Sequence, residues 1–225
     1  MAVKKVVVLD VGGTHVKVGS SDHKDLVKIE SGPAMTPPIM IAAVKKATAD
    51  WKYDAVAIGY PGPVLHGRPV AEPHNLGVGW GGFDFRKAFG KSVKLVNDAA
   101  MQALGSYEGG RMLFLGLGTG LGSALIVGGV VEPTELAHLP YKKGRTYEDY
   151  IGLRGLECLG KKRWARHVFD VVAKFKAAFQ ADYVVLGGGN AKFLKDLPPG
   201  ARLGDNTNAL KGGIRLFQDT AGSQK

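Results

Sequence analysis

The chain has 225 residues, of which 45% are hydrophobic, and a formal net charge of +10 at pH 7. That length suffices for two lobes of about a hundred residues each, or for one larger domain. The longest apolar runs are too short to span a bilayer, and no signal-peptide pattern opens the sequence. A single cysteine, Cys158, excludes an internal disulfide and a multi-cysteine zinc site. We therefore expect a cytoplasmic protein without a membrane partner, in which Cys158 is buried as a small hydrophobic residue.

Strands and helices alternate along the first half of the chain. The first expected elements are strands near Lys5–Val11, His15–Ser20 and Leu26–Gly32, followed by a helix near Ile39–Trp51 that Pro37-Pro38 opens. A strand at Ala55–Gly59, a turn at Tyr60–Pro63 and a loop at Asn75–Gly82 come next. A short helix near Asp84–Phe89, a strand at Val93–Val96 and a helix from Ala99 to about Gly105 complete this half. This alternation predicts an α/β fold with partly parallel sheets.

The second half repeats the alternation. Its expected elements are strands at Arg111–Leu117 and Ser123–Val131, a polar loop at Glu132–Tyr147, helices near Tyr147–Leu159 and Arg163–Phe179, a strand at Tyr183–Leu186 followed by a helix, and a last helix near Asn208–Phe217. Gly109-Gly110 marks a natural boundary and a candidate hinge. We therefore expect an N-terminal lobe at 1–108, a C-terminal lobe at 109–205, and a helix and tail at 206–225 that pack back on the N-terminal lobe.

Two glycine-rich segments look like imperfect copies of each other. Gly12-Gly13-Thr14 and Gly118-Thr119-Gly120 each follow a strand and precede another. Because glycine lets backbone N–H groups approach phosphate closely, the pair predicts two lobes that hold one polyphosphate chain between their turns. A dinucleotide-binding fingerprint would need a helix directly after the glycines. An ordinary hairpin without a ligand is the alternative for either turn.

Phosphoryl transfer also needs a metal ion and a base beside the attacking hydroxyl. Asp10, beside the first turn, is predicted to hold Mg²⁺ through water, which Mg²⁺ prefers to keep. Asn97-Asp98 follow another strand, at the end where ligands of open α/β sheets gather. Asp98 is predicted to be the base, and a near-normal carboxylate pKa suffices for it because the proton is taken late in a loose transition state. Its alternative role is to cap the helix that starts at Ala99.

Other polar and basic residues could hold a sugar and a polyanion. A sugar ring needs several polar side chains, and the loops offer Asn75, Asn97, Asp98, Glu135, His138 and Glu148. The basic residues are densest at Lys142-Lys143-Arg145 and Lys161-Lys162-Arg163-Arg166. These patches indicate either a surface that binds an anionic chain or a solvent-exposed charged face that keeps the protein soluble.

Six motifs in a fixed order resemble the ROK family of sugar kinases, within the actin/hexokinase/Hsp70 superfamily, and its polyphosphate glucokinases in particular. The motifs are Asp10–Lys17, Tyr60-Pro61-Gly62-Pro63, Asn97-Asp98, the Gly116–Gly122 run, Thr134-Glu135-Leu136-Ala137-His138-Leu139 and Gly187-Gly188-Gly189-Asn190. The resemblance covers nearly the whole chain. It implies two similar lobes of the actin-like ATPase (ribonuclease H-like) fold with a cleft between them.

The resemblance also implies an activity and a set of site residues. The activity is transfer of a terminal phosphoryl group from polyphosphate, ATP or both to the 6-hydroxyl of glucose or a related hexose. The implied roles are base for Asp98, hexose binding for Asn75, Asn97, Glu135, His138 and Glu148, phosphate contact for Lys17, and contact with a nucleotide's adenosine end for Gly187, Gly188 and Gly189. Zinc is not expected because the family's cysteine cluster is absent, and a homodimer is expected because similar kinases are often dimers.

Three alternatives stay open. The first is an ATP-only kinase for mannose, an N-acetylated hexosamine or allose. The second is a sugar-responsive repressor, but the family's repressors carry a DNA-binding module before the first strand, and only Met1–Lys4 precede that strand here. We therefore expect no nucleic-acid partner. The third is a sugar-binding protein without turnover, against which the presence of both Asp10 and Asp98 argues.

Overall fold

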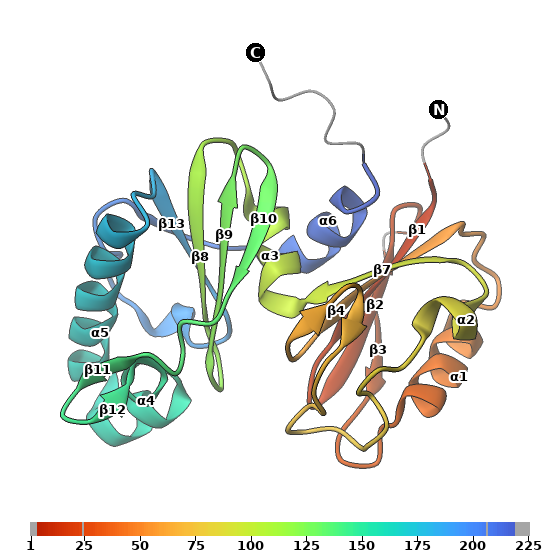
Figure 1. The fold of residues 1–225 in the computed structure, drawn as a ribbon, viewed down its shortest axis with the longest axis horizontal. Helices are drawn as coiled ribbons and strands as arrows, with labels where there is room; N and C mark the ends of the chain where they lie inside the picture. The colour runs from red at the N-terminus through yellow and green to blue at the C-terminus, as the bar shows by residue number, and fades with distance from the viewer. Residues whose placement is uncertain (1–3, 24, 206, 219–225) are drawn as a thin grey trace. The chain divides into compact units, whose positions relative to one another are not determined.

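The computed structural model describes residues 4–23, 25–205 and 207–218 (Figure 1). The chain forms two compact units. Of the described residues, unit 1 takes in those up to Met101 and residues 209–218, and unit 2 takes in Gln102–Asn208. The division lies inside helix α3 (Asp98–Ser106). Of the segment 206–225, only residues 207–218 are among those described.

Unit 1 is built on a five-stranded sheet with the strand order β3-β2-β1-β4-β7. Its strands are β1 (Val6–Val11), β2 (His15–Ser20), β3 (Val27–Glu30), β4 (Ala55–Tyr60) and β7 (Ser92–Asn97). Strands β1, β2 and β3 are antiparallel neighbours, whereas β4 and β7 run parallel to β1. Parallel strands end at the same edge of a sheet, so Asp10 and Asn97 lie toward one edge.

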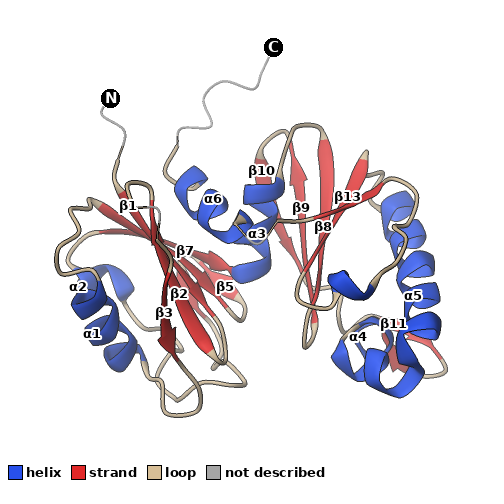
Figure 2. Cartoon of the chain, turned by 180° about the vertical axis from the view of Figure 1, so that it is seen from behind, coloured by secondary structure: helices blue, strands red, loops and turns tan. Residues whose placement is uncertain are grey.

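Strand β1 is apolar almost throughout because both of its faces are covered. Helices α1 (Pro37–Ala47) and α2 (Phe85–Phe89) lie along one face of the sheet (Figure 2). Helix α6 (Asn208–Arg215) packs on the other face, where Gly213 allows it to approach β1 closely. The residues that face α1 and α2 are Val7, Leu9 and Val11, and those that face α6 are Val6 and Val8.

Unit 2 has a second five-stranded sheet with the equivalent order β10-β9-β8-β13-β14. Its strands are β8 (Arg111–Leu117), β9 (Leu121–Val127), β10 (Val130–Thr134), β13 (Tyr183–Gly187) and β14 (Ala201–Leu203). The first three are antiparallel neighbours, and β13 and β14 run parallel to β8. Both units therefore share one topology, and the two glycine turns occupy equivalent positions after β1 and β8.

The helices of unit 2 are α4 (Tyr147–Ile151), α5 (Leu153–Ala178) and the short 3₁₀ helix η1 (Ala191–Phe193). Gly160, with φ +71°, interrupts α5, which agrees with the break expected between two helices there. The second part of α5 packs through Val168, Val171 and Phe175 on the sheet. The helix expected after Asn190 is only this one 3₁₀ turn.

The polar loop expected at Glu132–Tyr147 is wrong in part. Strand β10 extends to Thr134, and a hairpin forms from β11 (Pro140–Lys142) and β12 (Arg145–Thr146). Tyr141 ties this hairpin to α5, because its hydroxyl donates to Asp170 at 2.5 Å and lies 3.0 Å from His167 Nδ1. These contacts of one partly buried aromatic residue help to order a segment that is polar in sequence.

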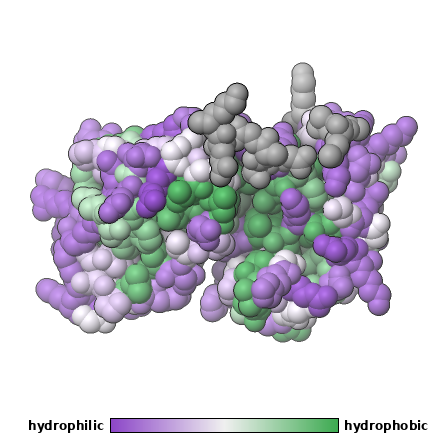
Figure 3. All heavy atoms as spheres, turned by 45° about the horizontal axis from the view of Figure 1, so that its top comes forward, coloured by the Kyte–Doolittle hydropathy of each residue, from purple (hydrophilic) through white to green (hydrophobic). Residues whose placement is uncertain are grey.

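Two further expectations concern the surface. Cys158 is exposed rather than buried, because it lies on the outer side of α5, away from the buried Leu156 and Trp164. Hydrophilic side chains cover most of the periphery on the face shown in Figure 3, with apolar patches between them. None of the helices in the described ranges combines the length and the apolar character that a membrane span requires.

Candidate active site

The first glycine turn joins β1 to β2 and exposes backbone donors. The N–H of Gly12 bonds to the carbonyl of His15 at 3.0 Å, which closes the hairpin. Ser31 binds the carbonyls: its hydroxyl donates to Gly12 at 2.6 Å and its N–H donates to Thr14 at 2.9 Å. Among the described residues, none accepts a hydrogen bond from the N–H of Gly13 or Thr14. The turn therefore presents two adjacent free N–H donors, as an anion requires.

Asp10 and Lys17 form a cross-strand pair at this turn. They lie opposite each other in the β1–β2 register, and Lys17 Nζ is 3.0 Å from Asp10 Oδ2. The Lys17 side chain is 47% exposed and that of Asp10 is 16% exposed. Lys17, expected to contact phosphate, thus has a carboxylate partner in this structure. Its exposed ammonium group is still open to an anion on its other side.

Asp98 is a half-buried carboxylate at the first residue of α3. Burial and, after it, the negative charge of Asp10 raise the pKa of Asp98 to about 7, although the N–H of Ala99 and the charge of Lys17 oppose the shift. The pKa of Asp98 is therefore higher than the near-normal value that would suffice for a base. The physical reason is that the carboxyl is withdrawn from water beside a second acid.

Gly59 on β4 allows this arrangement. Strand β4 lies between β1 and β7, and Gly59 is opposite Asp10 in the register. A Cβ at Gly59 would overlap the Met101 side chain and lie 3.4 Å from the Asp98 Cα. The sequence interpretation assigned no role to Gly59, although a glycine inside a buried strand signals a close approach.

Asn97 is the principal cap of helix α3. Its Oδ1 accepts from the N–H of Ala99 at 2.9 Å and of Ala100 at 3.3 Å, and its Nδ2 donates to the Gly62 carbonyl at 3.1 Å. Asp98 Oδ1 shares the Ala99 N–H at 2.7 Å. Capping is thus supplied mainly by Asn97, whose amide keeps one hydrogen for a ligand.

Asn75 lies directly over the first turn. An ideal Cβ at Gly13 would be 2.7 Å from Asn75 Cβ, so only glycine permits this contact. Glu72 holds the loop that carries Asn75, because its carboxylate accepts from the N–H groups of Trp80 and Gly81, both at 3.1 Å. These hydrogen bonds lower the pKa of Glu72. The structure therefore brings Asn75 to the turn.

The second glycine turn, in unit 2, follows the same pattern as the first. The N–H of Gly118 donates to the Gly120 carbonyl at 3.1 Å. The Gly118 carbonyl accepts from Asn190 Nδ2 at 2.8 Å, and the Thr119 carbonyl accepts from the N–H of Leu153 at 3.2 Å. Within the described ranges, the N–H groups of Thr119 and Gly120 meet no acceptor. As in the first turn, the carbonyl groups of this turn accept hydrogen bonds from the protein, while two adjacent N–H groups have no acceptor among the described residues.

Glu148 on α4 supports this second turn. Its Oε2 accepts from the N–H of Leu121 at 3.0 Å, and a Cβ at Gly120 would overlap that same carboxylate oxygen. Its own N–H donates to the carbonyl of Ala137 at 3.1 Å. Glu148, expected to bind hexose, therefore joins the turn to the segment that carries Glu135 and His138.

Glu135 and His138 point into solvent from one short segment. Their side chains are 70% and 72% exposed, and His138 Nε2 is 4.0 Å from Glu135 Oε1. Between them Leu136 and Ala137 are buried. Ser123 fixes the segment from beneath, since its hydroxyl lies 2.8 Å from Thr134 Oγ1 and donates to the Thr134 carbonyl at 3.0 Å; the sequence interpretation missed it.

The Gly187-Gly188-Gly189 run packs closely against β8. A Cβ at Gly187 would lie 2.5 Å from the Phe114 ring, and one at Gly188, where φ is +81°, would overlap the Leu117 backbone. Gly189 has open space around its Cβ position. Packing alone therefore requires glycine at 187 and 188, whereas Gly189 is free for another role.

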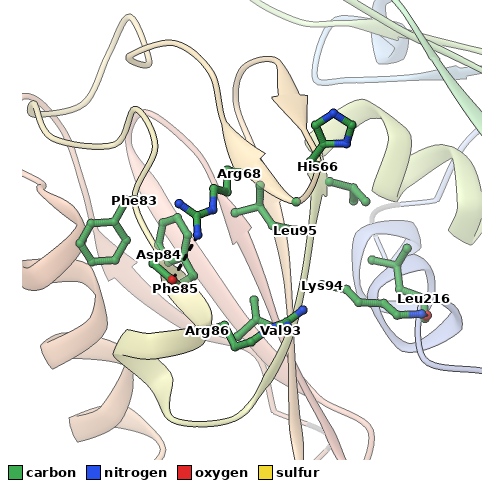
Figure 4. Close-up of a pocket in the computed structure, with 12 residues that line it drawn as sticks. His66, Arg68, Phe83, Asp84, Phe85, Arg86, Val93, Lys94, Leu95 and Leu216 are labelled. Atoms are coloured by element: carbon green, nitrogen blue, oxygen red, sulfur yellow. Dashed lines mark hydrogen bonds and ion pairs between the residues drawn. The ribbon is translucent and has the colours of Figure 1, made fainter.

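A cavity of about 450 Å³ in unit 1 lies beside the edge strand β7 (Figure 4). The hairpin of β5 (Val64–Leu65) and β6 (Arg68–Pro69) borders it, and Arg68 pairs with Asp84 at 3.3 Å. None of the predicted site residues lines this cavity. It is therefore distinct from the cluster of Asp10, Lys17 and Asp98.

A metal ion at this site would rely on few protein ligands. No group of three or more His, Cys, Asp or Glu side chains converges within the described part of the chain. Asp10 offers one partly exposed carboxylate next to free phosphate-binding donors. This set suits Mg²⁺, which keeps several waters and takes one or two carboxylates plus substrate phosphates.

Comparison with known proteins agrees with the geometry. The ROK family profile matches residues 6–133. The polyphosphate glucokinase of Mycobacterium tuberculosis (strain H37Rv) is 29% identical over 212 residues, which covers 80% of this chain and 76% of that protein.

Two solved structures show the fold. The inorganic polyphosphate/ATP-glucomannokinase of Arthrobacter sp. strain KM superposes with a TM-score of 0.79 at 22% identity, covering 95% of this chain and 98% of that one. A ROK family transcriptional regulator, a homolog of the E. coli MLC protein, superposes with a TM-score of 0.73 at 14% identity, covering 95% and 77%. These likenesses confirm the predicted α/β fold of the actin-like ATPase type, with two similar lobes.

Proposed function

Because the chain belongs to the ROK family, we propose that it is a sugar kinase that transfers the terminal phosphoryl group of inorganic polyphosphate or ATP to the 6-hydroxyl of glucose or a related hexose. The observation that carries the proposal is Asp98, a half-buried carboxylate at the end of β7 whose pKa is shifted by burial and by Asp10. The names of the similar proteins support it, since they include a polyphosphate glucokinase and a polyphosphate/ATP-glucomannokinase.

Asp98 acts as the general base in this proposal. A pKa near 7 matches a base that works at neutral pH, because the charged form is populated and still binds a proton well. The carboxylate takes the proton of the sugar hydroxyl as the hydroxyl oxygen attacks the terminal phosphorus. The bond from that phosphorus to the bridging oxygen of the donor breaks, and the shortened polyphosphate or the nucleoside diphosphate leaves. Asn97 keeps Asp98 in place by capping the same helix end.

The glycine turns hold the donor. The free N–H groups of Gly13 and Thr14, and those of Thr119 and Gly120, bind phosphate oxygens, and Lys17 adds a positive charge. Gly12 and Gly118 close the hairpins that present these donors. Asp10 would hold Mg²⁺ through water, and the ion would supply positive charge to the phosphate oxygens.

Polar side chains bind the hexose in this proposal. We assign this role to Asn75, Asn97, Glu135, His138 and Glu148. Glu148 uses one carboxylate oxygen to support the second turn, so its other oxygen is the one available to sugar. For a nucleotide donor, the adenosine end would lie by Gly187, Gly188 and Gly189.

The test is a matrix of donors and sugars with detection of hexose 6-phosphate. The donors are long-chain polyphosphate, tripolyphosphate and ATP, and the sugars are glucose, mannose, N-acetylglucosamine, N-acetylmannosamine and allose. Product with polyphosphate and glucose is expected, and product with ATP and another sugar alone would select the ATP-only alternative. The variant Asp98→Asn, which lacks the proposed base, is the matched control for background product. Folded protein that yields no product above this background with any pair would refute the proposal.

A further inference from the structure

A cavity of about 560 Å³ lies in unit 2 between helix α5 and η1. Its floor is apolar and half-buried, and its rim is basic. The floor residues are Ala165, Phe169 and Phe193, and the rim residues are Lys161, Lys162 and Lys195. Asp196 is the one carboxylate in the lining, so positive charge is in excess.

The aromatic ring of Phe193 organises this positive charge. Lys161 Nζ lies 4.5 Å and Lys192 Nζ 5.2 Å from the centre of the ring. Both distances are within the range of cation–π attraction, so the ring holds two ammonium groups near each other despite their repulsion. Among the described residues, no carboxylate lies within ion-pair distance of Lys161, Lys162, Lys192 or Lys195.

The cavity is joined to the second glycine turn through Asn190. The side chain of Asn190 donates to the Gly118 carbonyl at 2.8 Å, and its N–H donates to the Leu117 carbonyl at 2.9 Å. Helix η1 starts at the next residue, and Phe193 is three residues beyond Asn190, a distance of at most about 11 Å along the chain. An anionic chain on the free N–H groups of the turn could therefore extend to the lysines.

We propose that this cavity binds the distal part of an inorganic polyphosphate chain, remote from the phosphoryl group that is transferred. The inference rests on the proposed function and assigns its donor. Four unpaired ammonium groups suit a ligand with a charge on every unit. A nucleotide base would need the face of Phe193 for stacking, but ammonium groups already lie at that ring.

The experiment compares two double variants with equal loss of charge. Lys161→Gln/Lys195→Gln changes the rim, and Lys143→Gln/Arg166→Gln removes two exposed charges of unit 2 outside the cavity. Calorimetry with the full chain measures the Kd of long-chain polyphosphate, tripolyphosphate and ATP at several salt concentrations. For the rim variant we expect roughly 10-fold weaker binding of long-chain polyphosphate, and a salt slope lower by about 1.4, by analogy with lysine contacts to a single-stranded polyanion.

Binding of ATP to the rim variant should stay within about twofold of the unchanged protein, and so should all binding to the control variant. Equal losses in both variants would overturn the proposal, because net charge alone would then explain them. An equal loss for ATP would make the cavity a nucleotide site, and unchanged polyphosphate binding would also refute the inference. Binding is measured without turnover, so a chain that binds polyphosphate here but phosphorylates no sugar would refute the proposed function alone.

Discussion

The carboxyl group of Asp98 should reduce the free energy of unfolding at neutral and alkaline pH. Its pKa rises from 3.8 to about 7 on folding, mainly because of burial. The folded protein thus binds this proton more tightly than the unfolded chain, so stability falls as pH rises from about 4 to 7 and then levels off. About three pKa units at 1.36 kcal/mol each give an upper limit of about 4 kcal/mol.

The variant Asp98→Asn isolates this effect. Asparagine keeps an Oδ1 that can accept from the N–H of Ala99, and it cannot ionise. Urea unfolding of both proteins at pH 5 and pH 8, followed by tryptophan fluorescence, measures the difference. A Trp164→Phe background makes the signal specific for unit 1, which contains Trp51 and Trp80.

The variant should be more stable than the parent at pH 8, and the gap between them should grow by roughly 3 kcal/mol from pH 5 to pH 8. This outcome would mean that folding favours the neutral carboxyl while catalysis needs the charged one, a conflict typical of active sites. Parallel pH dependence of the two proteins would show that the Asp98 pKa is not raised, and would refute the reasoning.

Three further predictions follow from the same structure. The value of kcat/KM should rise with pH through an apparent pKa near 7. Asp10→Asn should move that midpoint to lower pH, because it removes a negative charge that raises the Asp98 pKa. An unchanged midpoint in the variant would show that the charge of Asp10 does not raise the Asp98 pKa. Gly188→Ala should destabilise the protein by about 2 kcal/mol or more, since the residue has φ +81° and adjoins the β8 backbone, whereas Gly189→Ala should change the unfolding free energy by less than about 1 kcal/mol; equal effects in urea unfolding would contradict this. Gly13→Ala should lower kcat/KM by roughly 10- to 100-fold, because the added Cβ displaces Asn75 and the loop that carries it. An unchanged kcat/KM in steady-state kinetics would contradict the close contact of Gly13 with Asn75.

Local sequence pattern predicted most of the fold because strands and turns here carry strong local signals. The strands His15–Ser20 and Arg111–Leu117 are confirmed at both ends. Helix α1 starts earlier than expected, since Pro37 occupies its first turn, and ends at Ala47 rather than at Trp51. The hairpin of β11 and β12 was missed because it depends on Tyr141 contacts with α5, which are distant in sequence.

The candidate site was predictable by residue type but not by environment. Gly13 and Asp98 belong to motifs and Asn75 is a polar residue of a predicted loop, yet the contact of Gly13 with Asn75 required the folded chain. The raised pKa of Asp98 depends on burial and on Asp10, which is 88 positions away in the sequence. Periodicity and spacing carry no information about such a pair.

The most direct test of the proposed base is the turnover of Asp98→Asn beside its affinity for hexose. Hexose 6-phosphate formation should fall by roughly 100- to 10,000-fold, while the Kd for the sugar measured by calorimetry changes by less than about threefold. A variant that retains turnover would contradict the assignment of Asp98, and so would one that loses activity only through lost sugar binding.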